Sequence, residues 1–135
     1  MARPIRVPFR CAGVILVALA LSGCAASHEV SHDLAVTNRA DFFQVRWGSL
    51  ETYTGRVSYE WTNSGSRATI RQECHTRDGL ARIEIRDAAG IVVHWKNLRE
   101  RGEFVTPDGE SGVWKITVIL DKTTGSLDVT VKKKG

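Results

Sequence analysis

The sequence predicts an all-β fold, an antiparallel β-sandwich of about seven to eight strands, and three observations support this prediction. Apolar and polar residues alternate with a period of two through most of the chain after residue 40. Turn-forming residues separate these stretches at short intervals. No stretch after residue 40 keeps the 3.6-residue period of a helix, so helical crossovers between parallel strands are not expected.

Each predicted strand has an apolar face and ends at a turn. Val57, Tyr59 and Trp61 form the first clear alternation, and residues 63–66 (Asn-Ser-Gly-Ser) form the turn that follows. Further turns are expected at 78–79 (Asp-Gly), 87–90 (Asp-Ala-Ala-Gly), 107–109 (Pro-Asp-Gly) and 123–125 (Thr-Thr-Gly). The inward-facing residues of these strands form the predicted core: Val57, Tyr59, Trp61, Ile70, Ile83, Ile85, Val93, Trp95, Trp114, Ile116, Val118, Leu120, Leu127 and Val129.

The same alternation predicts which residues face solvent. His94 has the opposite phase from Val93 and Trp95, so it is expected on the surface. Trp47 precedes a Gly-Ser pair at a strand end and is the tryptophan expected to be available to a ligand such as a sugar ring. Residues 132–134, three lysines, are expected to form a solvated tail. Cross-strand ion pairs are expected between outward-facing arginines and glutamates, namely Arg56, Arg67, Arg71, Arg82 and Arg86 with Glu60, Glu73 and Glu84.

The N-terminus has the pattern of an export signal. Residues 1–10 carry three arginines and no acid, and residues 11–23 form an apolar run of 13 residues. This run is shorter than the ~20 residues that a membrane-spanning helix needs. It ends at Leu21-Ser22-Gly23-Cys24, which resembles the lipobox of bacterial lipoproteins.

That resemblance implies a lipid anchor on Cys24. In bacterial lipoproteins the signal is cut before this cysteine, which receives a diacylglyceryl thioether and an amide-linked acyl chain. Each buried methylene of such chains contributes ~0.8 kcal/mol to membrane binding. Ala25, in the place where an aspartate commonly retains a lipoprotein at the inner membrane, favours the outer membrane. The domain is expected on its periplasmic face, with the cell surface as the alternative. The implied organisation is a signal peptide over 1–23, the lipidated cysteine and a tether over 24–40, and the β-sandwich domain over 41–135.

Charge and composition limit the function. The formal net charge is +4, but removing the three arginines of the signal from the 19 basic side chains leaves 16 against 15 acidic ones, a net of +1. A nucleic-acid partner is therefore not expected. The closing strands are similar to those of small bacterial jelly-roll and immunoglobulin-like sandwiches, which implies no particular activity. We expect a non-catalytic binding or structural module without a cofactor, bound to the membrane through Cys24, with an envelope protein or a cell-wall glycan as partner.

Two motifs leave an enzyme as the alternative, a small envelope hydrolase. Residues 28–32 match H-E-x-x-H, the pattern in which two histidines bind Zn²⁺, here His28 and His32 with Glu51 as a conceivable third ligand. The motif falls in the expected tether, without the braced helix that such a site needs, so no metal is predicted. Cys74 is the other candidate, as a nucleophile with His75 beside it and His94 as a possible base. Its phase with Ala68 and Ile70 predicts a core position instead.

Overall fold

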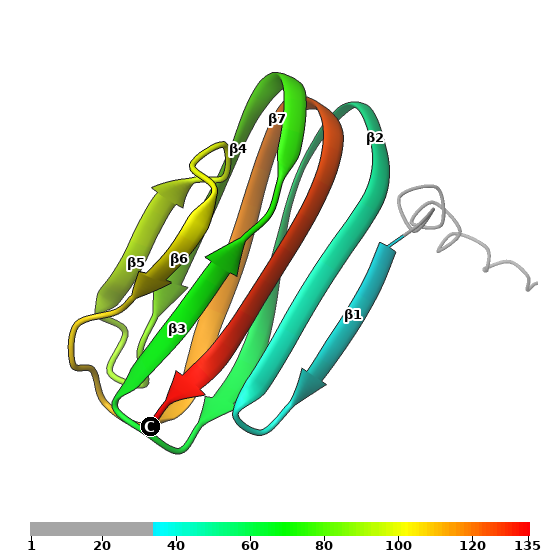
Figure 1. Cartoon of the computed structure of the whole chain (residues 1–135). Helices are drawn as coiled ribbons and strands as arrows, with labels where there is room; N and C mark the ends of the chain where they lie inside the picture. Colours follow the sequence, from blue (N-terminus) through cyan, green and yellow to red (C-terminus); the bar gives the residue numbers. More distant parts are fainter. Residues whose placement is uncertain (1–33) are drawn as a thin grey trace, which may run out of the picture. The chain divides into compact units, whose positions relative to one another are not determined.

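The computed structural model describes residues 34–135 and confirms the predicted all-β, antiparallel sandwich. Seven strands form it (Figure 1). Their bounds are β1 (Leu34–Arg39), β2 (Phe42–Asn63), β3 (Arg67–Gln72), β4 (His75–Arg86), β5 (Val92–Asn97), β6 (Gly102–Val105) and β7 (Gly112–Lys134). Within the described residues no helix is long and apolar enough to cross a membrane.

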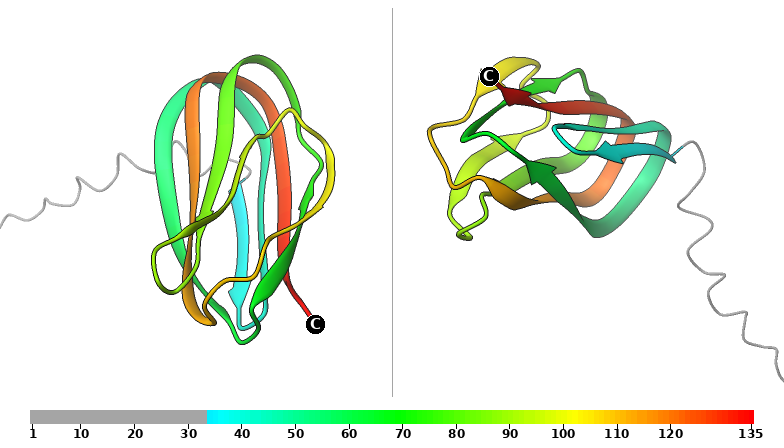
Figure 2. Two further views of the ribbon diagram at one scale, coloured as in Figure 1. Left: turned by 90° about the vertical axis from the view of Figure 1, so that its left-hand side faces the viewer. Right: turned by 90° about the horizontal axis from the view of Figure 1, so that it is seen from below.

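The two layers of the sandwich are halves of one bent sheet. β2 and β7, of 22 and 23 residues, pair antiparallel from Phe42 opposite Lys132 to Asn63 opposite Gly112, and both curve over at one end (Figures 1 and 2). The first half of β2 and the second half of β7 form layer A with β1, β3 and β6. The other halves of β2 and β7 form layer B with most of β4 and with β5.

The strands bend at one end of the sandwich, which we call the bent end. The register of β2 against β7 shifts between Trp47 and Gly55, and Lys122 in β7 has a φ of 52°. Gly79 in β4 has a φ of 83°, and a Cβ at this position would collide with the carbonyl oxygen of Lys122. The turn expected at 123–125 is therefore a bend in a continuous strand, because β7 stays paired with β2 on both sides of it.

The core between the layers confirms most of the predicted inward-facing residues. Eleven of the fourteen are buried: Trp61, Ile70, Ile83, Ile85, Val93, Trp114, Ile116, Val118, Leu120, Leu127 and Val129. Val57 and Tyr59 are half-buried and pack against this core. Cys74 is buried as predicted, and Trp47, which was expected to be accessible, is buried as well.

The burial of Trp95 and His94 is the reverse of the prediction. Trp95 is 51% exposed and His94 is 7% exposed. The reason is a bulge in the pairing of β4 with β5, where Ile85 lies opposite His94 but Arg86 lies opposite Val92. The extra residue, Val93, shifts the phase of β5 by one, which moves every later side chain to the other face.

The β domain begins earlier than predicted. Residues 34–39 were expected to belong to the tether, but they form β1, which pairs with Phe42–Trp47 through a tight turn at Ala40 and Asp41. β1 is an edge strand whose side chains are mostly exposed, so its sequence carries no apolar alternation. Residues 1–33, which include the signal peptide, Cys24 and the first part of the expected tether, lie outside the described residues.

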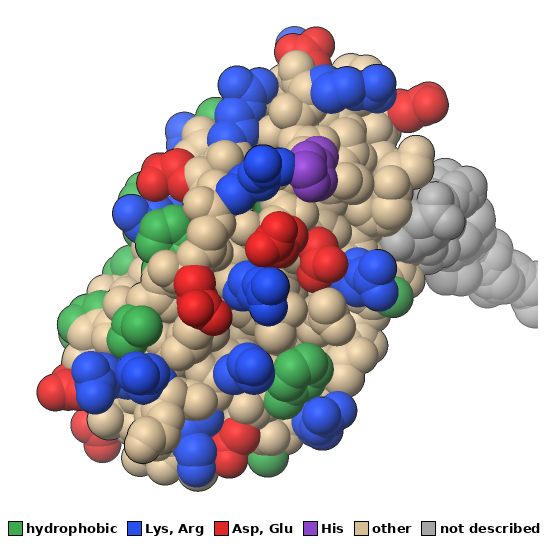
Figure 3. Space-filling model, viewed as in Figure 1, with side chains coloured by type: hydrophobic (Ala, Val, Ile, Leu, Met, Phe, Trp, Pro, Cys, Tyr) green, Lys and Arg blue, Asp and Glu red, His purple; other side chains and the backbone are tan. Residues whose placement is uncertain are grey.

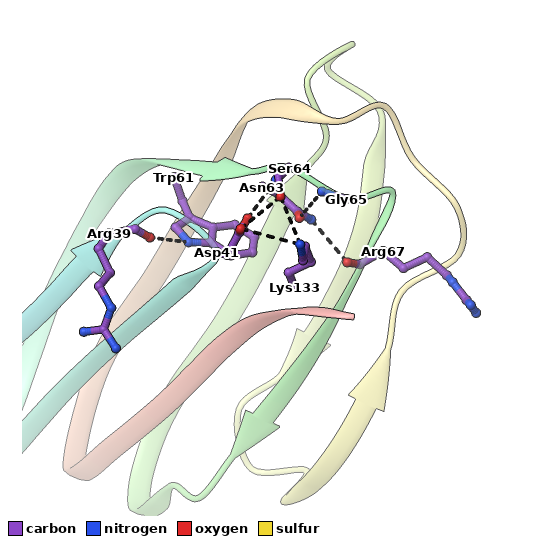
Figure 4. Close-up of polar contacts among 8 residues, drawn as sticks. All are labelled: Arg39, Asp41, Trp61, Asn63, Ser64, Gly65, Arg67 and Lys133. Atoms are coloured by element: carbon purple, nitrogen blue, oxygen red, sulfur yellow. Dashed lines mark hydrogen bonds and ion pairs between the residues drawn. The ribbon is translucent and has the colours of Figure 1, made fainter. Parts of the chain in front are cut away.

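The end opposite the bend, which we call the turn end, is closed by polar contacts around Asp41 (Figure 4). The Asp41 carboxylate accepts hydrogen bonds from the backbone N–H and the hydroxyl of Ser64, at 2.8 and 2.9 Å. The Lys133 ammonium lies 3.7 Å from the same carboxylate and donates to the Ser64 hydroxyl. The lysines at 132–134 are exposed as expected, but they do not form a tail, because they belong to β7 and pair with β3.

Candidate functional site

A basic hollow lies on the domain near the bent end. It has a volume of about 470 Å³ and is lined by residues from the start of β4 and from the loop between β5 and β6: Cys74, His75, Thr76, Arg77, Arg99 and Arg101. We call this feature the arginine hollow. The loop is held in place by Leu98, which is fully buried and whose N–H donates to the carbonyl of Ala81 at 2.8 Å.

A buried glutamine of β3 also holds this loop, through a hydrogen bond from the core side. Gln72 is fully buried, and its amide nitrogen donates to the carbonyl of Glu100 at 2.6 Å. Its amide oxygen lies 3.0 Å from Nε2 of His94, which donates to it because an amide oxygen can only accept. Burial, with a smaller effect from Lys96, lowers the pKa of His94 to about 4, so the ring is neutral at physiological pH. The loop that carries Arg99 and Arg101 is thus tied to the core.

The arginines of the hollow have polar contacts but no acidic partner. Nε of Arg99 donates to the Thr76 hydroxyl at 3.3 Å, and Nη1 of Arg101 lies 2.9 Å from Nδ1 of His75. Among the described residues, no carboxylate lies within ion-pair distance of Arg77, Arg99 or Arg101. Three guanidinium groups without a counter-charge form a site suited to a phosphate or a carboxylate.

Several other arginines on the molecule have a carboxylate partner. Arg71 lies 3.3 Å from Glu73, and Arg86 lies 2.7 Å from Glu84. Both pairs join residues two positions apart in the sequence, not residues on neighbouring strands as expected. Arg46 pairs across strands with Asp128 at 3.6 Å. The arginine hollow differs from these sites, because its three guanidinium groups lie together and none of them has a carboxylate within ion-pair distance among the described residues.

A shallow groove of about 400 Å³ lies beside the arginine hollow and extends across layer A to the start of β1. Its lining includes His75 at one side and Ala35 at the other, with Trp47 and Leu127 between them. Figure 3 shows the face of the domain that carries layer A, with a histidine next to Lys and Arg side chains near the bent end. The carboxylates in the groove, Glu73 and Asp128, are those that already pair with arginines. The groove and the arginine hollow thus meet at His75.

The structure does not pair Cys74 with the base that the hydrolase alternative needs. Cys74 forms part of the hollow but is only 2% exposed, and burial raises the pKa of its thiol to about 11. At neutral pH it is a thiol, a weak nucleophile. The possible base, His94, is bonded to Gln72 instead. His28 and His32 lie outside the described residues, and residues 34–135 contain no group of three or more His, Cys, Asp or Glu side chains placed to hold a metal ion.

The exposed tryptophan is Trp95 rather than Trp47. It lies on the outer face of layer B, where the guanidinium of Arg82 lies over its ring at 5.6 Å. Its neighbour across the strand pair is Glu84. An aromatic ring is therefore available on a different face from the arginine hollow.

Sequence reasoning missed the arginine hollow. Arg99 and Arg101 are neighbours on a loop, but Arg77 is more than twenty residues away, and the sequence contains other arginines at similar spacings. Only the pairing of β4 with β7 and the anchoring of the β5–β6 loop bring the three together. No signal in the sequence could have found it, because acids stand next to these arginines in the chain and only the fold shows that they pair elsewhere.

Comparisons with known proteins identify no family for this chain. No family model matches the chain, and no curated protein matches its sequence. Among solved structures, a chain from a crystal structure of accessory secretory protein 1, 2 and 3 in Streptococcus pneumoniae matches 77% of this chain and 87% of its own length, with 11% identity and a TM-score of 0.37. A chain of the Glycosylation Associate Protein (Gap123) complex from Streptococcus agalactiae matches 76% of this chain with 6% identity and a TM-score of 0.36, and this chain spans 39% of it. Likeness at this level indicates nothing about activity or partners.

Proposed function

We propose that this protein is a lipid-anchored lipoprotein of the bacterial cell envelope, whose β-sandwich is a non-catalytic binding or structural module. The observation that carries the proposal is Leu21-Ser22-Gly23-Cys24, which follows a basic and then an apolar segment. Nine residues separate Cys24 from Leu34, where β1 begins. The proposed chain is thus a lipid anchor, a short connection and one β domain.

Physical chemistry supports the anchor. Three acyl chains on one cysteine, at ~0.8 kcal/mol per buried methylene, exceed the two lipid signals needed for stable membrane binding. Ala25 in place of an aspartate favours the outer membrane, with the domain on its periplasmic face. The partner that we propose there is an envelope protein or a cell-wall glycan.

The burial of Cys74 supports a binding role over the hydrolase alternative. A thiol with a pKa of about 11 is a poor nucleophile at neutral pH. The hollow beside it presents arginine side chains, which bind anions well and are too basic to act as proton-transfer groups.

The test is lipidation of the full chain in cells. Cys24→Ser should abolish incorporation of labelled palmitate and release the protein from the membrane fraction. Cys11→Ser, which removes the cysteine inside the apolar run, is the matched control and should keep both. If the Cys24→Ser chain still incorporates palmitate, the lipoprotein proposal is wrong. Crosslinking in intact cells, followed by identification of the captured molecule, then tests for a protein or glycan partner.

A further inference from the structure

We propose that the arginine hollow binds the phosphate-bearing headgroup of an anionic phospholipid in the membrane to which the chain is anchored. This inference rests on the proposed function, because it needs the lipid anchor to hold the domain at the membrane. It assigns a ligand to a surface that is separate from Cys24. Two properties of the structure carry it, the unbalanced charge of the hollow and the place where β1 begins.

The first property is a cluster of guanidinium N–H donors that are not paired with a carboxylate. Arg99 uses two of its five N–H groups on Thr76 and on the carbonyl of Gly79, and Arg101 uses one on His75. The remaining N–H groups of both side chains, and those of Arg77, can donate to phosphate oxygens. Forked guanidinium donors match the geometry of a phosphate better than single ammonium groups do.

The acidic groups near the hollow have other partners. Glu73 pairs with Arg71 and Glu100 with Lys96. Asp78 accepts a hydrogen bond from the N–H of Gly79 and lies with Asp121 around a neighbouring hollow. An anionic headgroup entering the arginine hollow therefore meets three guanidinium groups and no carboxylate bonded to them.

The second property is the position of the start of β1, measured along the strand direction relative to the arginine hollow. Leu34 in β1 lies opposite Trp47 in β2, which in turn lies opposite Leu127 in β7. The residue before Leu127, Ser126, lies opposite His75 of the hollow in β4. The start of β1 and the hollow are thus at one level of layer A, three strand spacings apart, or roughly 14 Å. The groove from Ala35 to His75 joins them.

Chain length then places the hollow within reach of the membrane. The nine residues between Cys24 and Leu34 extend to at most ~30 Å, about twice the distance across the strands. β1 runs from this level toward the turn end, so the bent end is the end from which the chain enters. The exposed lysines 132–134 lie at the turn end, where β7 finishes beside Arg67, and are the farther basic group.

The experiment uses the full lipoprotein, reconstituted into vesicles of phosphatidylcholine alone or of phosphatidylcholine mixed with phosphatidylglycerol. Arginine modification by phenylglyoxal is measured at each site by peptide mass spectrometry. Arg77, Arg99 and Arg101 should react roughly fivefold more slowly in the phosphatidylglycerol vesicles, the change in rate that the near-surface attraction of one basic side chain produces. Arg39 at the turn end is the internal reference and should react equally in both.

Two variants with the same loss of charge test the location. Arg99→Gln with Arg101→Gln should remove the protection that phosphatidylglycerol gives to Arg77. Lys132→Gln with Lys134→Gln, at the turn end, should keep it. A third arm adds inorganic phosphate to the phosphatidylcholine vesicles and should give little protection.

Each remaining result overturns the inference in a recognisable way. Equal protection by inorganic phosphate would mean that the hollow takes a soluble anion rather than a lipid. Equal protection of Arg39 and Arg101 would mean unspecific adsorption of the domain. A wild-type chain that floats with the vesicles but shows no protection contradicts this inference alone. A chain that does not float with neutral vesicles contradicts the proposed function, and this inference with it.

Discussion

Trp61 and Trp114 pack edge to face across the β2–β7 pair, with ring centroids 5.9 Å apart and planes at 89°. The two residues are directly opposite in the ladder, and both are buried. Each indole N–H has a backbone acceptor, the carbonyl of Arg39 for Trp61 and that of Glu110 for Trp114. The pair therefore joins the core to two segments outside the strands that carry it.

Truncation of Trp114 should cost a large part of the stability of the domain. Trp114→Ala removes a fully buried ring, and we expect it to lower the free energy of unfolding by about 3–5 kcal/mol. Trp95→Ala is the matched control, because the ring is half exposed, and should cost less than about 1 kcal/mol. Urea melts of both variants, followed by circular dichroism, check this. Equal effects of the two substitutions would contradict the assigned core.

The bend in β4 should depend on a glycine. Gly79 and Gly90 have nearly the same φ, 83° and 86°, but a Cβ at Gly79 meets the backbone of Lys122 whereas one at Gly90 meets nothing within 4 Å. Gly90→Ala should cost about 1–2 kcal/mol from backbone strain alone. Gly79→Ala adds a collision and should cost above about 3 kcal/mol. Thermal melts of the two variants measure the difference, and equal costs would show that the close approach is absent.

His94 should make the stability depend on pH. Burial lowers its pKa from 6.5 to about 4 in the folded state, with Lys96 adding to the effect and Glu100 opposing it. Between these values the unfolded chain binds more protons than the folded one, so stability is full above pH 6.5 and falls as the pH falls toward 4. We expect a loss of about 2 kcal/mol from pH 7.5 to pH 5.

Urea melts across that range measure the effect. His94→Asn should flatten the dependence, because the group that titrates is gone. His75→Gln, at the exposed histidine of the arginine hollow, should leave the dependence in place. A flat profile for the wild-type protein would mean that His94 is not desolvated as described.

The first strand should contribute to stability although it buries little. A fragment of residues 33–135 should fold, because it matches one compact unit of the chain. A fragment of 41–135 loses β1 and with it the acceptor of the buried Trp61 N–H, so it should be less stable by about 2 kcal/mol or more. It also exposes the edge of β2 to pairing with other chains. Denaturant melts and sedimentation compare the fragments, with Val36→Thr as an exposed control in β1. Equal stability would mean that β1 is dispensable.

Several features of the domain followed from the sequence alone. The period-two alternation of Trp114, Ile116, Val118 and Leu120 is a local property of one strand, so it predicted both the all-β fold and the buried face. The position of Cys74 in the core followed in the same way. The lipobox-like residues 21–24 likewise carry their information locally, and the lipid anchor stays a prediction.

The tertiary structure decided what depends on a partner strand. The bulge opposite Arg86 reversed the faces of His94 and Trp95, and no residue within β5 indicates it. β1 was missed because a strand can be held by backbone hydrogen bonds with almost no apolar face. Arg77, Arg99 and Arg101 form one basic hollow only because a folded sheet places the start of β4 beside the β5–β6 loop. Local alternation reports which side of a strand is buried, while register, bulges and charge clusters arise from contacts between segments far apart in the chain.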